Sequence, residues 1–163
     1  MLPDYLAPRL KVLFCGTAAG RRSGMIGHYY AGRGNKFWKV LYEVGITDRL
    51  LTPESDRDVL DYAVGLTDLA KRVSGMDSQI TRDAFVTRQL TQLLEEWEPR
   101  RLAFNGKRAA QEFLGKQAVG GFGRYAIDGF PDVWILPSTS GAANKYWSIS
   151  PWQDLATDLT TNE

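Results

Sequence analysis

Residues 10–20 read LKVLFCGTAAG, and this stretch joins an apolar run to a turn made of small residues. The run at 11–15 is rich in β-branched and aromatic residues, and a parallel strand covered on both faces typically has such a continuous apolar sequence. Gly16 ends the predicted strand. Residues 17–20 carry little side-chain bulk, so a flat ligand can approach their backbone N–H groups. An ordinary strand-to-loop turn has the same pattern, because short glycine-rich turns are weak signals.

The length and cysteine content limit the class of protein. The 163 residues fit a single domain over 1–163, which is long enough to bury about two-thirds of the surface of the unfolded chain. Cys15 is the only cysteine, so this chain alone forms no disulfide and no cysteine-held metal site. No window has the character of a secretion signal or the length of a membrane span. We therefore expect a soluble, monomeric, cytoplasmic protein.

The net charge says little, but the distribution of charge is uneven. The chain has 20 Lys plus Arg against 19 Asp plus Glu, a formal net charge of +1, which does not by itself indicate a nucleic-acid partner. Basic residues gather at 21–39 and 107–145, whereas acidic residues gather at 54–61. The pattern is consistent with one basic and one acidic face, and equally with ordinary solvated surface charges.

Predicted strands alternate with predicted helices along the chain. Besides the first strand, the apolar runs at 101–104 and 133–136 indicate buried strands, and 124–127 indicates a shorter one. Helices are predicted at 35–44, 52–63, 81–98, 107–114 and 151–159, with Asn35 and Thr52 as N-terminal caps. Residues 21–34 are predicted to be an irregular loop and 64–69 a turn. This alternation predicts an α/β fold: a three-layer α/β/α arrangement with a short central, mostly parallel sheet.

Several longer stretches are similar to a known family of DNA repair enzymes. They are VLFCG at 12–16, NKFWKVLYEVGITDRLL at 35–51, LDYAVGLTDL at 60–69, LAFNGKRA at 102–109 and VWILPSTSG at 133–141. With them the chain resembles the mismatch-specific uracil-DNA glycosylases, the bacterial branch related to thymine-DNA glycosylase. The resemblance implies a monofunctional hydrolase, without metal or cofactor, that flips uracil from DNA and leaves an abasic site. It also implies association with the nucleoid and a preference for U:G or single-stranded uracil, where flipping is cheapest.

The first loop departs from the family pattern at the residue that matters most. The family commonly has GINPG there, and its Asn positions the hydrolytic water, whereas this chain has Ala18 at that place. We therefore expect Asp68 to be the catalytic residue. A carboxylate accepts a proton from water and stabilises the oxocarbenium-like sugar that develops as the base leaves. The alternative is that Asp68 merely caps a turn or the helix that follows Thr67.

The resemblance implies further site residues. Tyr30 corresponds to the aromatic residue that stacks on the flipped base, Ser23 lies near uracil C5, and the backbone amides of Thr17 and Gly20 hold the uracil carbonyls. In the second loop the family often has NPSGLSR, and here Ser138 replaces the base-contacting Asn. Ala142 replaces the Leu wedge, which normally fills the gap left by the flipped nucleotide. The residues expected to face DNA are Ser140, Gly141, Ala142, Ala143, Asn144 and Lys145.

Simpler interpretations remain open for several of these residues. Tyr30 also fits a surface tyrosine that packs its loop, Asn35 a simple helix cap, and residues 138–144 a polar turn. His28, the only histidine, is not expected to be an acid or electrophile. Two other functions compete with the glycosylase: a damaged-DNA-binding module that has lost hydrolysis, and a nucleotide-binding α/β enzyme. The second is disfavoured because the first loop has neither GxGxxG nor the P-loop lysine.

Overall fold

The structure is a computed structural model that describes residues 2–69 and 82–161. Its elements, in chain order, are β1 (Val12–Gly16), α1 (Arg21–Ile26), α2 (Phe37–Glu43), the 3₁₀ helix η1 (Pro53–Tyr62), β2 (Val64–Asp68), α3 (Arg82–Trp97), β3 (Arg101–Asn105), α4 (Lys107–Leu114), η3 (Lys116–Ala118), β4 (Gly123–Tyr125), β5 (Asp132–Leu136), η4 (Gly141–Tyr146) and α5 (Ser150–Thr161). The predicted start of the α3 helix at Thr81 lies outside the described residues.

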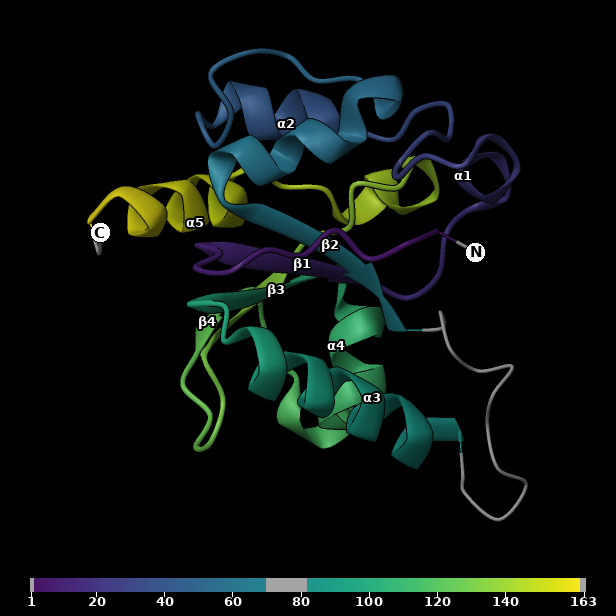
Figure 1. Cartoon of the computed structure of the whole chain (residues 1–163). Coiled ribbons are helices and arrows are strands. Elements are labelled where there is room, and N and C mark those ends of the chain that lie inside the picture. Colours follow the sequence, from purple (N-terminus) through teal and green to yellow (C-terminus); the bar gives the residue numbers. More distant parts are fainter. Residues whose placement is uncertain (1, 70–81, 162–163) are drawn as a thin grey trace.

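The described strands form one sheet in the order β2-β1-β3-β5-β4. The strands β2, β1, β3 and β5 are parallel, and β4 pairs antiparallel with β5 at the edge. Figure 1 shows the sheet between two helical layers, with α2, η1 and α5 on one side and α3 and α4 on the other. The predicted three-layer fold with a mostly parallel sheet is confirmed.

A separate apolar core lies on each face of the sheet, because side chains alternate along a strand. Val12 and Phe14 of β1 pack toward the layer of α2, η1 and α5. Leu13 and Cys15 pack toward the layer of α3 and α4. With both faces covered, β1 is buried at every position, as its continuous apolar sequence predicted.

The turn predicted at 64–69 is wrong, because Val64–Asp68 forms the fully buried strand β2. The glycine and the polar residues in VGLTDL are unusual in a buried strand, but the fold gives Gly65 and Thr67 specific contacts. Thr67 donates a hydrogen bond from Oγ1 to Asp4 Oδ1 at 2.6 Å. A Cβ on Gly65 would lie 2.7 Å from the carbonyl oxygen of Tyr5, so glycine there permits the N-terminal segment to pack against β2.

The irregular loop predicted at 21–34 is also partly wrong. Its first part forms the short helix α1, which ends at Gly27 in the left-handed conformation with φ of 77°. The internal Gly24 and the absence of an apolar period hid this helix from sequence reasoning. By contrast, the predicted start at Thr52 is confirmed, because Thr52 and Ser55 form a reciprocal capping box at the beginning of η1.

The four parallel strands bring their carboxyl ends to one edge of the sheet. Gly16 at the end of β1 is in register with Asp68 at the end of β2, and Asn105 at the end of β3 is in register with Leu136 at the end of β5. In open α/β sheets this edge is where ligands bind, because the loops that leave the strands surround a crevice there.

Candidate active site

A cavity of about 270 Å³ lies at this carboxyl edge. Its wall is built from the loop after β1, the segment between α1 and α2, the ends of β2 and β3, and the loop after β5. Segments that are far apart in the sequence therefore meet in one place. Among the lining residues in the described part of the chain, Asp68 is the only carboxylate and Arg33 the only cation.

Asp68 and Gly16 lie close together in the lining of the cavity. Asp68 is 9% exposed, and its Oδ1 lies 2.9 Å from the position that a Cβ on Gly16 would take. Any larger residue at position 16 would therefore push against the carboxylate. The glycine that closes β1 leaves space for the Asp68 side chain in the cavity.

The Tyr30 side chain approaches the same point. Its hydroxyl oxygen lies 3.6 Å from the hypothetical Cβ of Gly16, and its ring stacks on Phe37 with a centroid distance of 3.9 Å and an interplanar angle of 23°. Burial raises the pKa of Tyr30 far above its ordinary value, and the negative charge of Asp68 raises it further. The phenol is therefore protonated at neutral pH and is available as a hydrogen-bond donor.

Tyr30 has an unusual backbone conformation, with φ of 52° in the left-handed region. Such a conformation costs free energy for a residue with a bulky side chain and persists only when its surroundings enforce it. The hydrogen bonds that enforce it are made by the residues on either side of Tyr30.

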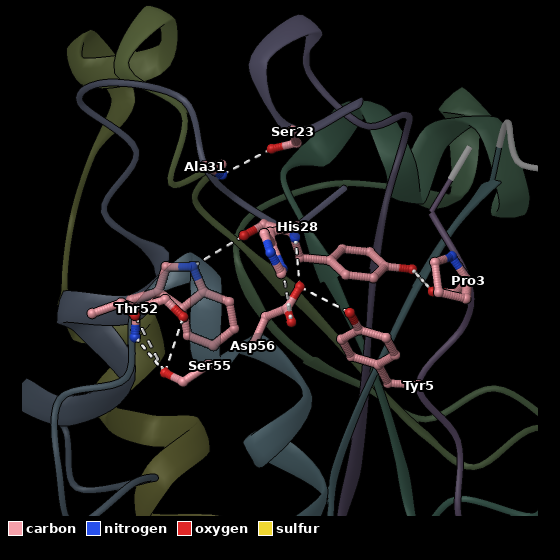
Figure 2. Close-up of polar contacts among 10 residues, drawn as sticks. Pro3, Tyr5, Ser23, His28, Ala31, Thr52, Ser55 and Asp56 are labelled. Carbon is pink, nitrogen blue, oxygen red and sulfur yellow. Dashed lines mark hydrogen bonds and ion pairs between the residues drawn. The ribbon is translucent and has the colours of Figure 1, made fainter. Parts of the chain in front are cut away.

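The buried carboxylate of Asp56 holds the residue before Tyr30 (Figure 2). Asp56 is 2% exposed and its Oδ2 accepts hydrogen bonds from the Tyr29 backbone N–H and the Tyr5 hydroxyl, both at 2.9 Å. The Nδ1 atom of His28 lies 3.3 Å from the other carboxylate oxygen. His28 thus faces Asp56 of η1 and is not part of the cavity wall.

Two further hydrogen bonds complete the support of Tyr30. The indole Nε1–H of Trp38 donates to the carbonyl oxygen of Tyr29 at 3.1 Å. The Ser23 hydroxyl accepts from the backbone N–H of Ala31 at 2.8 Å (Figure 2). Ser23 lines the cavity, and its hydroxyl oxygen accepts a hydrogen bond from the backbone next to Tyr30.

Asn105 and Thr139 fix the loop that follows β5. The Asn105 side chain donates from Nδ2 to Thr139 Oγ1 at 2.9 Å and accepts from the Thr139 backbone N–H at 3.0 Å. The Thr139 carbonyl oxygen in turn accepts from the Lys36 backbone N–H at 2.9 Å. Both Asn105 and Thr139 line the cavity, and sequence reasoning missed them. Their position just after two predicted strands was the signal that pointed to this edge.

The cavity gathers most of the predicted site residues but not all of them. The predicted residues that line it are Thr17, Gly20, Ser23, Tyr30, Asp68, Ser138, Ser140 and Gly141, and Ala18 lines it too. The residues Ala142, Ala143, Asn144 and Lys145 lie on η4 outside the cavity wall. There the Asn144 side-chain oxygen accepts a hydrogen bond from the Lys36 ammonium group, which connects η4 to the segment before α2. The N-cap of α2 is Lys36, one residue after the predicted cap Asn35, whose side-chain oxygen accepts from the Phe37 N–H at 3.0 Å.

The described residues contain no cluster of three or more His, Cys, Asp or Glu side chains with the arrangement of a metal site. Within the same part of the chain, no helix has the length and apolar character needed to cross a membrane.

Comparison with known proteins identifies the family. A solution NMR structure of a protein from Methanosarcina acetivorans, described as a candidate uracil DNA glycosylase, matches with a TM-score of 0.63 and 22% sequence identity. The match covers 98% of this chain and 96% of that one, and at this identity it shows a shared fold. Residues 3–156 match the sequence family described as the Uracil DNA glycosylase superfamily. This match spans nearly the whole chain, which therefore belongs to the uracil DNA glycosylase superfamily.

Proposed function

We propose that this protein is a monofunctional uracil-DNA glycosylase, which hydrolyses the bond between uracil and deoxyribose and leaves an abasic site in DNA. The observation that carries the proposal is the carboxylate of Asp68 in the lining of the carboxyl-edge cavity, close to Gly16 at the start of the loop of small residues. Superfamily membership supports uracil in DNA as the substrate, and this carboxylate supplies a group able to activate water.

The size of the cavity suits a single base. Its volume of about 270 Å³ is below the range of about 300–1,000 Å³ that is usual for sites that hold drug-sized ligands. A base inside a duplex is out of reach of such a cavity. An enzyme that acts on it must extrude the nucleotide from the stack, which costs least at a mismatch or in a single strand. We therefore expect U:G and single-stranded uracil to be better substrates than U:A.

The proposed reaction is a displacement by water at C1′ of the sugar. The water oxygen forms a bond to C1′ while the bond from C1′ to N1 of uracil breaks, and the electron pair of that bond leaves with the base. Asp68 accepts a proton from the water, and its charge stabilises the positive charge that develops on the sugar. We expect the N–H groups of Thr17 and Gly20, two residues that line the cavity, to stabilise the anionic base, as donors do in an oxyanion hole.

No lysine lines the cavity among the described residues. A glycosylase that also cuts the strand needs an amine nucleophile to form a Schiff base with the sugar. We therefore expect an intact abasic strand as the product. Binding to DNA is assigned to the exposed surface of η4 and to Arg33 at the cavity wall, because basic side chains attract phosphates.

One observation favours a second candidate, a damaged-DNA-binding module without hydrolysis. Ala18 lines the cavity with a methyl group where the related mismatch-specific enzymes have the Asn that positions water. If Asp68 does not replace that Asn, the cavity still holds an everted base but releases it unchanged.

Incubation of the purified protein with labelled oligonucleotides distinguishes the two candidates. The substrates are a U:G duplex, a U:A duplex and a single strand with one uracil, and a C:G duplex is the matched control. Abasic sites are detected by alkaline cleavage, and affinity is measured on the same DNA. The glycosylase predicts uracil-dependent abasic sites that need alkali to become breaks. Selective binding of uracil DNA without product would instead support the binding module, and neither binding nor product would refute both.

A further inference from the structure

We propose that the Tyr30 hydroxyl group, and not only the face of its ring, takes part in catalysis, by holding the attacking water together with Asp68. The proposal rests on the glycosylase function described above and adds a catalytic residue to it. Stacking of the Tyr30 ring on the flipped base, which the family resemblance implies, makes no use of the hydroxyl.

The first support is the convergence of the two polar groups across Gly16. The Asp68 Oδ1 atom lies 2.9 Å and the Tyr30 hydroxyl oxygen 3.6 Å from the one point where a Cβ on Gly16 would be. Asp68 belongs to β2, and Tyr30 belongs to the segment between α1 and α2. Because Gly16 has no side chain, both polar groups come close to its backbone, and all three residues line the same cavity.

The second support is the state of the hydroxyl itself. Its oxygen is buried, and no described residue lies within hydrogen-bond geometry of it. The amide of Asn105 faces it closely enough to lower its pKa somewhat, although burial and Asp68 act more strongly in the other direction. Buried polar atoms in folded proteins nearly always have a partner, and the exceptions concentrate where a site has a function. A water molecule or a ligand group in the cavity supplies the partner that this hydroxyl lacks.

The third support is the rigidity of the Tyr30 side chain. Phe37 covers one face of its ring, and the backbone on either side is held by Asp56, Trp38 and Ser23. These bonds maintain a left-handed conformation that an unrestrained tyrosine avoids. These contacts fix the direction of the Tyr30 hydroxyl group. A tyrosine whose ring only packed a surface loop would not need a fixed hydroxyl direction.

The chemistry assigns opposite roles to the two groups. The Tyr30 phenol is protonated, so it donates a hydrogen bond to the water oxygen, while the Asp68 carboxylate accepts one from the water. The water is then held by one donor and one acceptor, and its second lone pair stays free to form the bond to C1′. The proton released in that step goes to Asp68, and Tyr30 keeps its own proton throughout.

The test compares Tyr30→Phe with wild type and with Tyr42→Phe. Tyr30→Phe keeps the ring against Phe37 and removes only the hydroxyl, and Tyr42→Phe makes the same deletion at an exposed position on α2. Three quantities are measured: the single-turnover rate of uracil release, the affinity for DNA that carries the uncleavable 2′-fluoro-deoxyuridine, and the melting temperature.

Loss of the water contact predicts a rate for Tyr30→Phe that is lower by about tenfold or more. The affinity for the uncleavable DNA should stay within about twofold, because ring stacking is kept. The melting temperature should be unchanged or higher, because an unpartnered buried hydroxyl has been removed. Tyr42→Phe should match wild type in all three quantities.

Two results would overturn the proposal and leave the glycosylase function standing. One is a wild-type excision rate for Tyr30→Phe. The other is a fall in rate that is matched by an equal fall in affinity or by a lower melting temperature, because these indicate a binding or structural role. If the wild-type protein itself releases no uracil from any substrate, the glycosylase function fails, and this proposal fails with it.

Discussion

Removal of the Asp56 carboxylate should destabilise the protein more than any other single truncation of a polar side chain on η1. Asp56→Ala leaves two buried donors without an acceptor, the Tyr29 backbone N–H and the Tyr5 hydroxyl, both now bonded at 2.9 Å. Each buried unsatisfied group costs about 1–3 kcal/mol. His28 adds little because its side chain is 32% exposed and water can replace the contact. We expect the free energy of unfolding to fall by about 3–4 kcal/mol. The fall is smaller than the full cost of two unsatisfied donors, because the variant no longer has to bury the charge of Asp56.

Urea denaturation followed by tryptophan fluorescence measures this change. Asp56→Asn keeps an oxygen in the position that accepts from Tyr5 and Tyr29, so it should lose only about 1 kcal/mol. Asp58→Ala is the matched control on the same helix. Its partner Arg49 lies at 3.1 Å, but both side chains are well exposed, so the change should stay within about 0.5 kcal/mol. If Asp56→Ala is no less stable than Asp58→Ala, the reasoning about the buried network is wrong.

Three other substitutions test different parts of the account. Gly16→Ala places a methyl group 2.9 Å from Asp68 Oδ1 and displaces that carboxylate. Single-turnover excision should therefore slow by about 100-fold, and a normal rate would contradict the role of Asp68 in the cavity. Tyr5 has its pKa raised to about 12 by burial and by Asp56. Since the unfolded phenol ionises near pH 10, stability should fall as the pH rises from about 10 to about 12, and this fall should be smaller in Tyr5→Phe when unfolding is measured across that range. Lys145→Ala should weaken binding to all DNA sequences alike and reduce the slope of log affinity against log salt by about 0.9, whereas an unchanged slope would remove Lys145 from the interface.

The sequence predicted the parts of the fold that depend on local pattern. The apolar runs located β1, β3 and β5, and the helices α2, α3, α4 and α5 followed from apolar spacing and capping residues. The strand β2 escaped because its hydrogen bonds and its close packing against the N-terminal segment are long-range. Nothing in VGLTDL shows that Thr67 meets Asp4, 63 residues away.

The sequence likewise indicated part of the candidate site but not the network that supports it. The resemblance to the glycosylase family pointed to Asp68 and Tyr30, and both line the carboxyl-edge cavity, although their catalytic roles remain predictions. The network around Asp56 was not predictable, because it joins residues 27 and 51 positions apart that carry no motif. Asn105 lies at the end of a strand that the sequence did indicate, so the topology of the sheet was the clue to its role.

The most direct test of the central claim is the single-turnover rate of uracil release from a U:G duplex by wild type and by Asp68→Asn, with affinity for the same duplex measured in parallel. Asn has nearly the shape of Asp but accepts no proton from water. Asp68→Asn should release uracil about 10²–10⁴-fold more slowly than wild type while it still binds the duplex. Release of uracil by Asp68→Asn at the wild-type rate would contradict the central claim.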